Sequence, residues 1–67
     1  RSDAERLGRL LETLAERERE LVSMKYGAGL SNREIARVTG LTETNVGSIL
    51  HRTVKVLRAG WDEGEST

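Results

Sequence analysis

The chain has 67 residues, no cysteine, no proline and a formal net charge of zero. One domain at most fits this length, and a domain so small buries only about 60% of its unfolded surface. The single histidine, His51, has too few partners for a structural zinc site, so we expect neither a metal nor a cofactor. No apolar run is long enough for a membrane span or signal peptide.

Charge is unevenly distributed along the chain. Residues 31–60 carry five basic and two acidic side chains, whereas residues 61–67 carry three acidic ones and no basic one. Such segregation is typical of a surface that attracts an anionic partner. A net charge of only +3 in the middle segment predicts weak, salt-sensitive nucleic-acid binding. It also raises the hypothesis that the acidic tail shields the basic segment.

The pattern of apolar residues predicts an all-α domain of four helices. Leucines 7, 10, 11 and 14 recur at helical spacing and indicate a first helix over residues 3–14, with Ser2 or Asp3 as N-cap. A second helix begins near Ala15, buries Leu21, Val22, Met24 and Tyr26, and stops at the glycines of residues 27–29. The alternating charges of residues 16–20, which follow the start of the second helix, are expected to form a solvated face.

The third and fourth helices are predicted by capping signals. Ser31 and Glu34 form a capping box, after which Ile35, Ala36 and Val38 are expected to be buried as far as about Thr39. Gly40 suits a left-handed C-cap. Thr42 or Glu43 opens a last helix that we expect to reach about Arg58. Trp61 is then expected either to fold back onto the bundle or to belong to a frayed end, and residues 61–67 to form a disordered acidic tail outside a domain of residues 1–60.

A short helix, a turn containing glycine and a longer helix describe a helix-turn-helix. One side of the last helix is apolar and should pack inward, through Val46, Leu50, Thr53, Val54 and Leu57. The other side is polar near its start and basic further along, an order that suits base contacts followed by phosphate contacts. The residues that we expect to contact DNA are Arg33, Arg37, Thr42, Thr44, Asn45, Ser48, His51, Arg52 and Lys55. The alternative is that these are ordinary solubilising side chains.

Four motifs in order, LAEREREL at 14–21, KYGAGLSNREIA at 25–36, GLTETNV at 40–46 and LHR at 50–52 with LR at 57–58, closely resemble region 4 of bacterial RNA polymerase sigma factors. The extracytoplasmic-function branch is the nearest likeness. The resemblance implies an all-α, winged-helix-like domain without strands that reads the −35 promoter element. It also implies a hydrophobic cleft on the first three helices for the flap of the polymerase β subunit, an anti-sigma factor or other regulatory protein as partner, and a place in the bacterial cytoplasm with the nucleoid.

Some residues depart from the family pattern. Gly47 stands where many relatives have lysine or arginine, so either the backbone approaches DNA closely there or the domain reads DNA less strongly. Ile49 and Val56, seven residues apart on one face, replace frequent cations. They either widen the apolar stripe or form a contact for a protein partner.

Two other functions fit parts of the sequence. The DNA-binding output domain of LuxR-type regulators shares a similar GLSN-x-EIA run, although the residues around it favour the sigma factor. A protein-interaction module with a sigma-like fold and little DNA binding would fit the neutral charge and Gly47. An enzyme is not expected, because the chain has no phosphate-binding glycine loop, no cysteine nucleophile and no partner set for a triad around His51. We also expect no small-molecule substrate and no membrane partner.

Overall fold

The computed structural model describes residues 2–66 of the chain, and the side chains of residues 2–63. It contains α1 (Asp3–Glu12), α2 (Glu16–Val22), a π-helical turn η1 (Ser23–Gly27), α3 (Asn32–Thr39) and α4 (Glu43–Ser66). All regular structure in the described part is helical, which confirms the all-α prediction.

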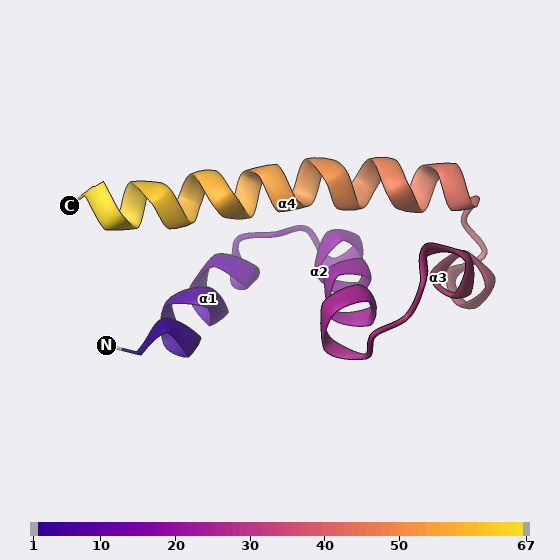
Figure 1. The fold of residues 1–67 in the computed structure, drawn as a ribbon, viewed down its shortest axis with the longest axis horizontal. Helices are drawn as coiled ribbons and strands as arrows, with labels where there is room; N and C mark the ends of the chain where they lie inside the picture. Colours follow the sequence, from indigo (N-terminus) through magenta and orange to yellow (C-terminus); the bar gives the residue numbers. More distant parts are fainter. Residues whose placement is uncertain (1, 67) are drawn as a thin grey trace.

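The long helix α4 organises the molecule (Figure 1). The three shorter helices lie along it in reverse order, so that α3 is near its start, α2 near its middle and α1 near its C-terminal end. The two chain ends consequently lie at the same end of the molecule. The shape is elongated, with extents of 40 × 19 × 17 Å.

The core lies where α2, α3 and the first half of α4 meet. Leu21, Ile35 and Val46 are completely buried there, and Val22 and Leu50 are nearly so. The expected inward side of α4 is confirmed, because Thr53 is also completely buried while Val54 and Leu57 are half-buried. Two expectations were wrong: Val38 is 67% exposed and Tyr26 is 64% exposed.

The capping signals of α3 are confirmed. The Ser31 hydroxyl accepts a hydrogen bond from the Glu34 amide at 3.1 Å, and Glu34 Oε1 accepts one from the Ser31 amide at 2.9 Å. Gly40 ends α3 with φ of 80°, in the left-handed region that glycine adopts without steric cost. The helix-turn-helix of α3 and α4 is therefore specified locally, by residues on either side of each helix end.

The expected end of the last helix near Arg58 was wrong. The helical backbone continues through Ser66, in place of the disordered tail expected for residues 61–67, of which residue 67 lies outside the described part. Trp61 is half-buried, so the expectation that it packs on the bundle is the one confirmed. Packing against α1 outweighs the local signal of Gly60, which resembles a helix stop. The domain boundary at residue 60 stays a prediction.

Candidate nucleic-acid interface

The exposed side of α4 begins at its N-terminus, directly after Thr42. The Thr42 hydroxyl accepts a hydrogen bond from the Asn45 amide at 3.0 Å, which fixes where the helix starts. Thr42 therefore has a structural role in addition to the DNA contact predicted for it. Because the positive end of the helix dipole lies here, this turn favours an approaching anion.

The structure brings the predicted polar and basic residues of α4 onto one side of the helix. Val46, Leu50 and Thr53 face the core, whereas the predicted contact residues of this helix are all exposed: Thr44, Asn45, Ser48, His51, Arg52 and Lys55. From Thr44 to Lys55 the helix rises by about 16 Å, and the major groove of DNA is wide enough to admit an α-helix. Small polar groups come first and cations follow, as sequence-specific contact with bases and anchoring to phosphates require.

Helix α3 adds two further cations. Arg33 and Arg37 are both exposed, on the helix that precedes the turn. The pKa of Glu34 is lowered by the hydrogen bond from the Ser31 backbone, then by the one from the Ser31 side chain, with a smaller effect of Arg37. Glu34 is thus engaged in capping α3, and its charge also interacts with Arg37.

Gly47 does not lie on the exposed side of α4. It is half-buried and faces the start of α3, where a side-chain carbon at this position would lie 3.7 Å from Asn32 Nδ2. The two explanations that we considered for Gly47 both placed it toward DNA. The structure instead gives it a place in the contact between α3 and α4.

Ile49 and Val56, the candidate contact for a protein partner, differ in their exposure. Ile49 is half-buried and packs against the core, as the wider apolar stripe required. Val56 is 56% exposed. The two side chains therefore do not form one exposed pair, and Val56 alone is accessible to a partner.

The acidic end of α4 does not cover the basic side of the same helix. Because the helix continues past Arg58, Asp62 lies about 10 Å further along the axis than Lys55. The shielding hypothesis required the tail to fold back over the residues before it. The helical backbone carries Asp62 and Glu63 away from Thr44, Asn45 and Ser48 instead.

An apolar cleft lies on another part of the molecule, between α1, η1 and α4. Its volume is about 420 Å³, and Tyr26, exposed in the structure, forms part of its rim. The residues that line it are Leu7, Leu11, Val22, Ser23, Tyr26, Gly27 and Leu57. The resemblance implied a cleft on the first three helices, but no residue was assigned to it, and the contribution of Leu57 from α4 was not anticipated. The signal that the sequence did offer is the helical spacing of Leu7 and Leu11, which places both on one side of α1.

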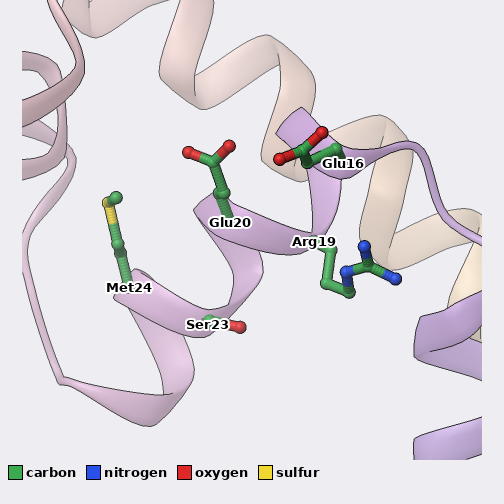
Figure 2. Close-up of a pocket in the computed structure, with 5 residues that line it drawn as sticks. All are labelled: Glu16, Arg19, Glu20, Ser23 and Met24. Atoms are coloured by element: carbon green, nitrogen blue, oxygen red, sulfur yellow. The ribbon is translucent and has the colours of Figure 1, made fainter.

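A second hollow, of about 440 Å³, follows one side of α2 and η1 (Figure 2). Figure 2 shows that its side chains come from a single helical run and include both charges: Glu16, Arg19, Glu20, Ser23 and Met24. Residues 16–20 are exposed except for Glu18, which caps α2 by accepting a hydrogen bond from the Ala15 amide at 3.0 Å. This agrees with the solvated face expected for the run.

The described part of the chain holds neither a membrane-spanning helix nor a cluster of metal-binding side chains. No helix among residues 2–66 has both the length and the apolar character that crossing a membrane requires. Within the same part of the chain, His, Cys, Asp and Glu side chains do not gather in threes or more as a metal ion would need.

The comparison with protein families agrees with this geometry. The family model for sigma-70, region 4 matches residues 4–57, which is most of the chain and includes all of α3 and the basic part of α4. Neither curated proteins nor solved structures gave a match. Between the two DNA-binding families considered, the match selects the sigma factor. The chain belongs to the sigma-70 region 4 family, whose members are DNA-binding helix-turn-helix domains of the transcription machinery rather than enzymes.

Proposed function

We propose that this domain recognises the −35 element of a bacterial promoter by placing the start of α4 in the major groove. The observation that carries the proposal is the single exposed side of α4, where Thr44, Asn45 and Ser48 precede Arg52 and Lys55. The first three residues would contact base edges and the two cations would hold phosphates. Arg33 and Arg37 on α3 would contact the backbone beside the groove.

The affinity is expected to depend on the rest of the sigma factor. The whole chain is neutral, and Glu43 in the first turn of α4 opposes a phosphate. We therefore propose that the domain binds DNA weakly alone and firmly when polymerase holds it at the promoter. His51 and Thr42 are assigned to the same interface, and Thr42 is expected to contribute less because its hydroxyl already caps α4.

Binding of the domain to promoter fragments in low salt tests this role. Replacing Arg52 and Lys55 together by alanine should reduce the slope of log affinity against log salt by about 2, since each cation accounts for about one phosphate. Exchanging Arg17 and Arg19 on α2 for alanine is the matched control, because it removes the same charge from exposed positions outside the helix-turn-helix. If both double variants lose the same DNA affinity, the effect comes from net charge and not from the exposed side of α4. Salt-independent or absent DNA binding by the wild type would favour the protein-interaction module.

We also propose that the apolar cleft between α1, η1 and α4 binds the flap helix of the polymerase β subunit. The cleft has the apolar lining that an amphipathic helix inserts into, and it lies apart from the exposed side of α4. Promoter DNA and polymerase would then be held at the same time. An anti-sigma factor or other regulatory protein would act by covering one of these surfaces, with Val56 as a contact between them. Such a domain acts in the cytoplasm, on the DNA of the nucleoid.

A peptide with the sequence of the flap helix tests the cleft. Leu7→Glu places a charge in the cleft wall at a residue that is 43% exposed, so the fold should tolerate it while peptide affinity falls. Val38→Glu is the control, because Val38 is another exposed apolar residue and lies outside the cleft. Equal peptide binding by wild type and Leu7→Glu would exclude this cleft as the docking site.

A further inference from the structure

Helix α1 is held in place differently from the other helices. None of its residues is buried, and Leu10 and Leu11 are only half-buried. Its contacts with the remainder of the fold are chiefly with α4. A ten-residue helix is marginal in water by itself, so particular contacts with α4 must determine where α1 lies.

Arg6 and Trp61 form the first of these contacts. The guanidinium carbon of Arg6 lies 3.9 Å from the centroid of the Trp61 ring, within the range of a cation–π interaction. Arg6 Nη2 also donates a hydrogen bond to the Trp61 carbonyl oxygen. One side chain therefore binds both the ring and the backbone of a residue 55 positions away in the sequence.

Leu10 and Gly60 form the second contact, one turn further along α1. A side-chain carbon at position 60 would lie 2.8 Å from Leu10 Cδ2, closer than packed atoms approach one another. Gly60 thus lets the backbone of α4 reach α1, and the glycine that resembles a helix stop in the sequence serves a packing contact within the helix.

The residues of α1 that make these contacts lie next to the residues of α1 that line the apolar cleft. Arg6 and Leu10 are four residues apart and so share one side of the helix, and they contact the end of α4. Leu7 and Leu11 are also four residues apart, on the neighbouring side, and they line the cleft. The position of α1 therefore sets the position of one cleft wall.

We propose that Arg6, Leu10, Gly60 and Trp61 form a clasp that fixes α1 against α4 and so shapes the apolar cleft for its helical ligand. Gly60 and Trp61 lie beyond residues 4–57, the segment that matches the family model, so the match does not include the α4 half of the clasp. The proposal rests on the docking of a helix in the cleft. Clasp closure and peptide binding then stabilise each other, as linkage requires, whereas the basic side of α4 is independent of both.

Trp61 is the only tryptophan, so its fluorescence reports directly on the clasp. Arg6→Met keeps an unbranched, apolar side-chain stem and removes the guanidinium group with its charge. We expect this variant to show red-shifted Trp61 emission, faster amide hydrogen exchange in α1 and peptide affinity lower by about fivefold or more. Its affinity for promoter DNA should fall no more than that of the control. Arg9→Met is that control, because Arg9 is exposed on the same helix and carries the same charge.

The outcomes separate the clasp from the proposed docking. If Arg6→Met frees α1 and Trp61 yet binds the peptide as the wild type does, the clasp does not shape the cleft, and the docking proposal stands. If the wild type itself binds no peptide, the docking proposal fails and the linkage to the cleft fails with it. Unchanged exchange in α1 in Arg6→Met would overturn the clasp altogether. Circular dichroism identifies a variant that has unfolded, and Arg6→Lys, which restores a cation without the planar fork, should then recover part of the tryptophan signal.

Discussion

The two ends of α4 are packed in different ways. Around its first half, Leu21 of α2, Ile35 of α3 and Val46 of α4 itself are completely buried. Around its second half, α1 has no buried residue and is held through Arg6 and Trp61. Segments with few buried apolar contacts open more readily than a core does. We infer that the end that would contact DNA is rigid, and that the end carrying the apolar cleft is adjustable.

Truncation of one side chain at each end should give the largest difference. Ile35→Ala removes a completely buried side chain and should lower the free energy of unfolding by about 2–5 kcal/mol. That is a large share of the total stability of a domain of this size. Leu7→Ala, at a residue 43% exposed, should cost about 1 kcal/mol or less. Urea unfolding of the two variants measures both values, and similar costs would contradict the contrast between the ends.

Thr53 is a buried polar residue of α4. It is completely buried, and its hydroxyl has no hydrogen-bond partner among the described residues. Thr53→Val keeps the branched shape and removes the unsatisfied group, so we expect a gain of about 1 kcal/mol. Thermal unfolding should then show a rise in Tm of about 4–8 °C. A lower Tm would mean that the hydroxyl is satisfied in solution.

Two glycines of α4 provide a finer comparison. At position 47 an added methyl meets Asn32 at an ordinary contact distance of 3.7 Å, so Gly47→Ala should gain about 0.5–1 kcal/mol of helix propensity. At position 60 the same methyl meets Leu10 at 2.8 Å. Gly60→Ala should therefore lose that gain and shift the emission of Trp61. Equal stabilisation by both substitutions would show that α1 moves away from the added methyl at position 60 without a loss in the free energy of unfolding.

The smallest effect is expected from the charge of Glu34. Its pKa is lowered in the folded state by the hydrogen bonds from Ser31, so its stabilising contribution is present at neutral pH and is lost as the pH falls through the folded-state pKa. Glu34→Gln should lower Tm by no more than a few degrees at pH 7. The gap from the wild type should close as the pH falls through this lowered pKa. If the difference in Tm persists in acid, it comes from the shape of the side chain and not from its charge.

Local signals explain which parts of the fold could be predicted. The Ser31 and Glu34 capping box and the Gly40 C-cap each depend on residues within one turn, so the sequence located α3 and the start of α4 correctly. The apolar spacing of Val46, Leu50 and Thr53 likewise identified the buried side of α4 and, by difference, its exposed side.

Contacts between distant residues explain what could not be predicted. The pair of Arg6 and Trp61 joins positions 55 residues apart, and the extension of α4 past Gly60 depends on how Leu10 packs there. The π-helical turn η1, which brings Ser23 and Tyr26 to the cleft, has no simple sequence signal. Periodicity also assigned Tyr26 and Val38 to the core, because a short helix offers more apolar residues than its neighbours cover.

A titration of the labelled domain with a promoter duplex, followed by amide NMR, tests the central claim most directly. The account predicts that shifts concentrate in α3 and in residues 42–55, grow weaker as salt is added, and leave α1 and the Trp61 indole unaffected. Shifts centred on α1 and the cleft, with residues 42–55 silent, would contradict it.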